Sequence, residues 1–111
     1  MERFGAKGLQ KFLCDEEIAL VKSSKTAAGF WATKEAFSKA LGTGIGAECA
    51  FKDIQIYKTA KGAPKLALSK TIVERFNIID ATLSITHDGE YAISVVNIEC
   101  NSPTTDKIKQ F

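Results

Sequence analysis

The sequence predicts an α+β fold in which a small antiparallel sheet packs against helices. Two observations predict it. Apolar residues recur at helical spacing over about residues 27–41, which places one stripe of a long helix against the core. Residues 81–87 and 90–98 alternate in polarity on either side of Asp88-Gly89, which is the favoured two-residue type I′ turn of a β-hairpin. A long helix combined with such a hairpin is typical of the α+β class.

The chain ahead of the long helix predicts two short helices, over residues 6–13 and 15–22. Cys14 or Asp15 stands at the cap position of the second one, and acidic residues follow in its first turn, where they favour a helix start.

The long helix has start and stop signals of its own. Ser24 or Thr26 can cap its beginning, and Gly42 follows the last periodic residue as a C′ glycine. Its predicted core stripe consists of Phe30, Thr33, Phe37, Ala40 and Leu41.

Two further strands and a helix are predicted in the middle of the chain. Residues 51–58 and 65–68 read as strands on either side of a loop at 59–64. Ser69 can cap a helix that runs to about Phe76.

The composition of the 111 residues, of which 45% are apolar, fits a single small domain with a thin core. We assign residues 1–100 to this domain and residues 101–111 to a polar tail. No run approaches the roughly 20 apolar residues of a membrane helix, and the N-terminus lacks the apolar segment of a signal peptide. We therefore expect a cytoplasmic protein without membrane contact.

The cysteines and the net charge exclude several classes of function. Cys14, Cys49 and Cys100 are odd in number and widely spaced, so neither a disulfide framework nor a structural zinc site is expected. A net charge of +2 is too small to indicate nucleic-acid binding.

Basic residues collect in the first quarter of the chain, which would suit an acidic partner, although charge alone favours a solvated helical surface as their explanation. They are Arg3, Lys7, Lys11, Lys22 and Lys25.

Two features of the helix and of the loop after it have both a functional and a structural interpretation. Glu35 and Lys39 are four residues apart and point away from the core stripe, as in a surface salt bridge of small energy. The loop Gly42–Gly46 carries glycine at every second position, so its backbone amides could approach a phosphate, or it could be a flexible turn.

Two stretches resemble one known family. Residues 29–44, GFWATKEAFSKALGTG, and residues 83–92, LSITHDGEYA, are similar to the signature segments of the holo-acyl-carrier-protein synthases, which are 4′-phosphopantetheinyl transferases. The segments FKDI at 51–54 and GAP at 62–64 fall where that family has similar residues. The resemblance extends from about residue 4 to residue 99.

This resemblance implies an activity and a set of partners. Members transfer the 4′-phosphopantetheine group of coenzyme A to a serine of apo acyl carrier protein, which supports fatty acid biosynthesis, and release adenosine 3′,5′-bisphosphate. They require Mg²⁺ and commonly form homotrimers with active sites between subunits, so we expect a trimer of the 4′-phosphopantetheinyl transferase fold.

The resemblance also implies roles for individual residues. Glu35 matches the metal-binding glutamate and Lys39 is placed to hold the pyrophosphate, so these two are the expected catalytic residues. The expected coenzyme contacts are Lys34, Lys39, Gly42, Thr43, Gly44 and His87. The expected contacts to the acidic carrier protein are Arg3, Lys7 and Lys11.

The chain departs from the family pattern at two places. Family members begin with a strand that carries a second metal-binding aspartate, and this sequence begins where that strand should end. Phe30 stands where many members have arginine, which leaves more of the coenzyme's charge to Lys34 and Lys39. The first departure keeps an alternative open, a non-catalytic module of the same fold that binds coenzyme A and carrier protein.

Overall fold

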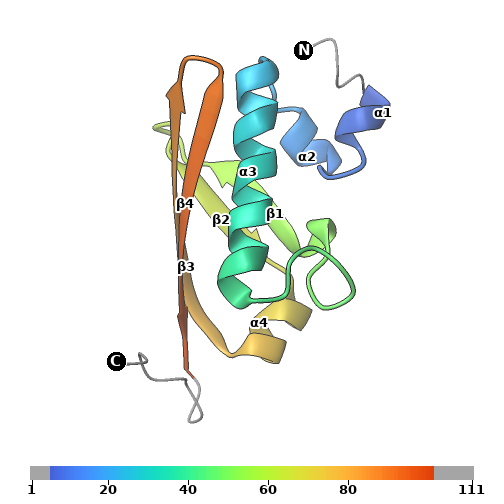
Figure 1. The fold of residues 1–111 in the computed structure, drawn as a ribbon, viewed down its shortest axis with the longest axis vertical. Coiled ribbons are helices and arrows are strands. Elements are labelled where there is room, and N and C mark those ends of the chain that lie inside the picture. Colours follow the sequence, from blue (N-terminus) through green and yellow to red (C-terminus); the bar gives the residue numbers. More distant parts are fainter. Residues whose placement is uncertain (1–5, 102–111) are drawn as a thin grey trace, which may run out of the picture.

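The long helix α3 (Ser24–Leu41) packs along the β-hairpin of β3 (Ile78–Asp88) and β4 (Tyr91–Cys100) in a computed structural model, which describes residues 6–101 (Figure 1). A second hairpin, β1 (Ile54–Lys58) and β2 (Pro64–Leu68), completes the β part. Helices thus cover antiparallel strands, and the predicted α+β class is confirmed.

The helix α3 begins earlier than its hydrophobic pattern indicated. Ser23, not Ser24 or Thr26, is its N-cap and accepts a hydrogen bond from the Thr26 amide at 3.4 Å. At the other end Gly42 has a φ of 84° and donates to the Lys39 carbonyl, so the predicted C′ glycine is confirmed. The apolar pattern does not indicate Ser23, because the two residues after it are exposed and add no apolar periodicity.

The strands form two separate two-stranded sheets in the described part of the chain. In the first, Ile54 pairs with Leu68 and Lys58 with Pro64. The segment 51–53 that was predicted as the start of this strand is a 3-10 turn, η1 (Phe51–Asp53), because the Asp53 carboxylate accepts the Ala50 amide and holds a tight turn there.

The turn of the second hairpin lies one residue later than predicted. Asp88 pairs with Tyr91, so Gly89 and Glu90 are the two loop residues. Gly89 has a φ of 60°, and Glu90 is not among the described residues with positive φ. Glycine at the first loop position alone is the type II′ pattern, so the type I′ prediction was wrong. His87 keeps its predicted place at the strand end, opposite Ala92.

The core divides into two clusters along α3. One surrounds Phe30 and includes Phe12 and Ile56, and the other surrounds Phe37 and includes Ile54 and Ile72. The predicted stripe is confirmed at Phe30, Thr33 and Phe37, which are buried, with Leu41 half-buried and packed on the second cluster.

Ala40 was also predicted to be in the stripe and is exposed. At about 100° per residue it lies roughly 60° from Phe37, which places it at the edge of the buried face.

The remaining helices are short. α1 (Ala6–Leu9) and α2 (Asp15–Ile18) cover less of the chain than the helices predicted at 6–13 and 15–22. α4 (Lys70–Phe76) follows Ser69, which caps it as predicted by accepting the Ile72 amide. None of the helices within residues 6–101 combines the length and the apolar character that crossing a bilayer requires.

Candidate functional site

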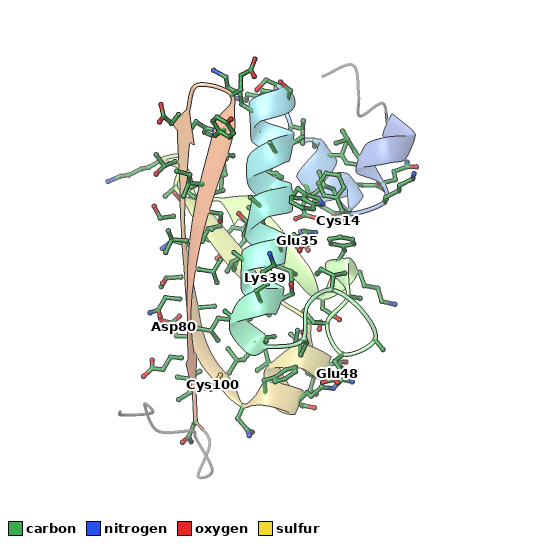
Figure 2. All side chains as sticks on the ribbon, viewed as in Figure 1. Cys14, Glu35, Lys39, Glu48, Asp80 and Cys100 are labelled. Carbon is green, nitrogen blue, oxygen red and sulfur yellow. The ribbon has the colours of Figure 1, made fainter. Side chains whose placement is uncertain are left out.

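Glu35 and Lys39 share one face of α3. Glu35 is half-buried and Lys39 is exposed, and at about 100° per residue Glu35 points roughly 160° away from Phe37. Both lie along the helix, away from Asp80 and Cys100 on the β3–β4 hairpin (Figure 2). Among residues 6–101 no ion pair joins them, although the same spacing gives a 3.9 Å pair between Lys70 and Glu74. The surface salt bridge that their spacing suggested is therefore absent, and both charges remain available to a ligand.

Lys34 does not reach this surface. Its side chain is fully buried, and its ammonium group lies 2.8 Å from the Glu17 carboxylate and 2.7 Å and 3.2 Å from the carbonyl oxygens of Phe12 and Phe51. Burial lowers the pKa of Lys34, while the Glu17 carboxylate opposes that shift. All three ammonium protons serve contacts inside the fold, so the expected contact between Lys34 and coenzyme A was wrong for this structure.

Glu17 completes that network from α2. One carboxylate oxygen accepts from Lys34 and from the Cys14 amide, and the other accepts from the Ile56 amide at 2.9 Å. α2, α3 and β1 are therefore joined by one buried ion pair. This ion pair is not predictable from the sequence, because Glu17 is one of two adjacent glutamates at a helix start and only its burial distinguishes it from Glu16.

The glycine loop uses its amides to end α3. Gly42 donates to the Lys39 carbonyl, and Thr43 and Gly44 both donate to the Ser38 carbonyl. The Thr43 hydroxyl lies 2.8 Å from the Gly44 carbonyl. The amides of residues 42–44 are therefore already used inside the fold, and a phosphate at this loop would have to be bound by other groups. The loop directly follows the helix that carries Lys39.

His87 borders a cavity at the N-terminal half of α3. The cavity has a volume of about 190 Å³ and opens to solvent. Its wall consists of residues from α3, from β3, and from β1, β2 and the loop between them, among them Thr26, Gly29, Phe30, Lys58, Ile85 and His87. The sequence had indicated His87, whereas Lys58 and Gly29 were not singled out.

The position of Lys58 could have been anticipated. It is the last residue of β1, and the segment Gly62–Pro64 that contributes to the same wall had been noted for its family resemblance. A residue that ends a strand lies at the same end of the sheet as the turn that follows it. The position of Lys58 directly before the turn therefore predicts that its side chain lies close to the Gly62–Pro64 segment.

The predicted carrier-binding residues are only partly within the described structure. Arg3 and the side chain of Lys7 lie outside it. Lys11 is exposed and borders, with Lys52, a cavity of about 120 Å³ that is lined by Phe12 and Phe51. The arrangement is a basic rim around an apolar floor.

Cys14 and Cys49 show no sign of a reactive thiol. Burial raises the pKa of both Cys14 and Cys49, which keeps the thiol protonated. The interpretation of these two cysteines as incidental thiols agrees with this direction.

A metal site made of protein groups alone is not found among residues 6–101, where no three His, Cys, Asp or Glu side chains come together. Mg²⁺ commonly takes only one or two carboxylates and completes its shell with substrate phosphates and water. The half-buried Glu35 carboxylate, which has no ion pair within the described chain, is compatible with that mode of binding.

Comparison with known proteins identifies the family. A family model described as the 4′-phosphopantetheinyl transferase superfamily matches residues 1–96. The holo-[acyl-carrier-protein] synthase of Sulfurimonas denitrificans is 63% identical over 99 residues, which are 89% of this chain and 82% of that protein.

Solved structures agree with this match. The holo-[acyl-carrier-protein] synthase of Helicobacter pylori in complex with coenzyme A has a TM-score of 0.83 and 47% identity, covering 88% of this chain and 86% of that chain. A holo-(acyl-carrier-protein) synthase from Bacillus anthracis, in complex with CoA (3′,5′-ADP), has a TM-score of 0.74 and 35% identity, covering 90% and 86%. The chain therefore belongs to the 4′-phosphopantetheinyl transferase superfamily.

Proposed function

We propose that this member of the superfamily is a holo-acyl-carrier-protein synthase, which transfers 4′-phosphopantetheine from coenzyme A to a serine of apo acyl carrier protein. Its named relatives carry that activity. The observation that carries the proposal at the level of residues is that Glu35 and Lys39 share one accessible face of α3 and form no ion pair with any group in residues 6–101. With these substrates, the protein would act in the cytoplasm and supply fatty acid biosynthesis.

The reaction is a phosphoryl-type transfer. The carrier serine oxygen forms a bond to the β-phosphorus of coenzyme A, and the bond from that phosphorus to the bridging oxygen breaks. Adenosine 3′,5′-bisphosphate leaves with the bridging oxygen, and the serine proton passes to a base. Such transfers depend mainly on positioning and on neutralising charge.

Each of the two charged residues has a separate task in this scheme. Lys39 would neutralise the charge that develops on the pyrophosphate. Glu35 would bind Mg²⁺ together with substrate phosphates, and the metal, when bound, would supply further neutralisation of the pyrophosphate. The proton of the carrier serine would pass either to a metal-organised water or to Glu35.

The nucleotide end of coenzyme A is assigned to the cavity beside His87. Lys58 and His87 come from different hairpins and border the same space, so two nitrogen donors could face an anionic nucleotide. Many family members have arginine at the position of Phe30, and Phe30 lines this cavity. Lys58, which lines the same cavity, would supply the positive charge that the phenylalanine does not.

The two halves of the proposed site lie on different faces of α3. Gly29 faces the His87 cavity, whereas Glu35 points roughly 120° and Lys39 roughly 80° away from it. One coenzyme molecule that uses both halves is more easily bound between two subunits than within one, which supports a homotrimer with shared sites.

An uncovered apolar face offers the surface for such an assembly. Tyr91, Ile93 and Val95 alternate along β4 with exposed fractions of 78%, 54% and 61%, on the side of the hairpin that faces away from α3. A row of large apolar side chains on one sheet face is typical of a subunit interface.

The carrier protein is assigned to the basic rim that includes Lys11 and Lys52. The cavity between Lys11 and Lys52 combines cations with an apolar floor, which suits an acidic partner that inserts an apolar side chain. Arg3 and Lys7, which are predicted from the family resemblance, are proposed to contact the carrier protein as well.

The decisive experiment compares two pairs of charges at the same spacing. Glu35→Gln and Lys39→Ala should each lower kcat for modification of apo carrier protein by at least about 100-fold, as expected for loss of a transition-state contact. Glu74→Gln and Lys70→Ala are the matched controls, because this exposed pair on α4 has the same spacing. The controls should retain wild-type kcat.

Two results would count against the proposal. Near-normal turnover by both α3 variants would remove Glu35 and Lys39 from the reaction. Binding of coenzyme A without any transfer by the wild type, at every Mg²⁺ concentration, would favour the non-catalytic binding module instead.

A further inference from the structure

Gly29 occupies a helix position that its backbone does not explain. It lies in the interior of α3 and is not among the residues with positive φ. Glycine at such a site costs about 1 kcal/mol relative to alanine. The reason for glycine must therefore lie in the space around it.

That space is filled by the β3 strand. A Cβ atom at position 29 would lie 3.1 Å from Cγ2 of Ile85, and 3.4 Å and 3.7 Å from Cε1 and Nε2 of His87. The imidazole ring thus lies directly against the bare helix backbone, at the wall of the cavity.

The helix cannot easily move away to admit a methyl group. The Thr33 hydroxyl donates to the Gly29 carbonyl at 2.8 Å, and it lies 2.8 Å from the Ser94 hydroxyl on β4. Since Thr33 has one proton, Ser94 must be the donor of the second bond. The turn of α3 at Gly29 is thereby tied to the hairpin that carries His87.

We propose that Gly29 is a positioning residue for His87 and sets the binding of the nucleotide end of coenzyme A. This inference rests on the proposed function and adds to it a steric determinant of affinity. A methyl group at position 29 crowds Cγ2 of Ile85 at 3.1 Å, whereas the His87 ring atoms at 3.4 Å and 3.7 Å come only into ordinary contact with it. Because Ile85 has to give way, β3 shifts and carries the exposed imidazole, two residues further along the strand, away from its position at the cavity wall. The ligand then loses a contact with His87, while Glu35 and Lys39 are unaffected.

The test is Gly29→Ala in the full chain. We expect the KM for coenzyme A and the Kd for adenosine 3′,5′-bisphosphate to rise roughly tenfold, the loss typical of one hydrogen bond to a charged group. The kcat at saturating coenzyme A should stay within about twofold of wild type. Inhibition by 4′-phosphopantetheine, which lacks the nucleotide, should not change.

A double-mutant cycle identifies the route of the effect. His87→Ala should raise the same constants, and Gly29→Ala should add nothing in the His87→Ala background, because the displaced ring is already gone. An equal further rise in that background, or no rise in the single variant, would refute the positioning role.

A folding control keeps the result interpretable. Ile85→Leu removes Cγ2 at nearly constant volume, so Gly29→Ala/Ile85→Leu gives a folded variant even if the single substitution is strained. Its KM should lie between those of wild type and Gly29→Ala; a value above that of Gly29→Ala would overturn the steric account. Wild-type protein that binds neither ligand would refute the proposed function itself, whereas normal wild-type binding with an unchanged Gly29→Ala variant refutes only the role of Gly29.

Discussion

The buried pair of Glu17 and Lys34 allows a quantitative prediction for Lys34→Met. Methionine approximates the length of lysine but has no charge and no donor, so Glu17 keeps its charge in a site where both side chains are about 1% exposed. Two backbone amides still donate to Glu17, but the carbonyls of Phe12 and Phe51 each lose the lysine donor. Removing one partner of a buried pair costs about 3–5 kcal/mol, a large part of the roughly 5–15 kcal/mol that stabilises a small domain.

Glu17→Gln should cost a similar amount, although glutamine has the same shape. Both oxygens of Glu17 accept hydrogen bonds, and an amide offers only one acceptor. Its NH₂ group must then face either the Ile56 amide or the Lys34 ammonium, and both are donors. The double variant should cost clearly less than the sum of the single variants, because no uncompensated charge remains in the core.

The assay is urea unfolding followed by circular dichroism, at one protein concentration for all variants. Lys70→Met is the control, because its ion pair at 3.9 Å is solvent-exposed and should contribute less than about 0.5 kcal/mol. A loss below about 1 kcal/mol for Lys34→Met, or strict additivity in the double variant, would mean that the pair is hydrated in solution, and the reasoning would fail.

Two further predictions concern acid stability and assembly. Hydrogen bonds from the Ala50 amide, which has the larger effect, and from the Ser69 hydroxyl hold the pKa of Asp53 below its ordinary value of 3.8. The stabilising contribution of the Asp53 carboxylate is therefore complete above that value and is lost as pH falls through the folded-state pKa. The stability difference between wild type and Asp53→Asn should stay constant above about pH 5 and shrink below about pH 4 in urea titrations, and a difference that grows toward acid would contradict this sign. Val95→Asp, which places a charge on the exposed face of β4, should convert the proposed trimer into monomers in light scattering and abolish transfer, while an active Val95→Asp monomer would argue against shared sites.

The sequence predicted best where a local signal acts alone. The cap at Ser69, the glycine after α3 and the alternation along β3 and β4 are each decided by neighbouring residues, so the pattern was sufficient. The hairpin turn shifted by one residue because Gly89 has positive φ in either register, and Asp88 extends the strand instead of entering the turn.

The role of Lys34 could not be predicted from the sequence because it depends on a partner 17 residues away. Next to Glu35 in a motif rich in charge, Lys34 looked like another exposed cation. The side chains of an 18-residue helix point in all directions around its axis. Whether Lys34 contacts water or a buried carboxylate therefore depends on where α2 packs against α3. Resemblance to a family identifies which residues matter and leaves open what each one contacts.

The register of α3 connects these assignments. Taking Gly29 as zero, residues at about 100° intervals place Phe37 near 80°, Lys34 near 140° and Glu35 near 240°. Phe37 packs into the core, and Lys34 reaches Glu17. Glu35 points outward on the same side of the helix as Trp31, which is 47% exposed. One helix thereby packs against the hairpin that carries His87, is joined through Lys34 to α2, and presents the charged face of Glu35 and Lys39. Inserting one residue between Gly29 and Lys34 would turn the buried ammonium, the core side chains and the charged face by about 100° relative to the His87 cavity, so stability and the proposed site depend on the same helical register.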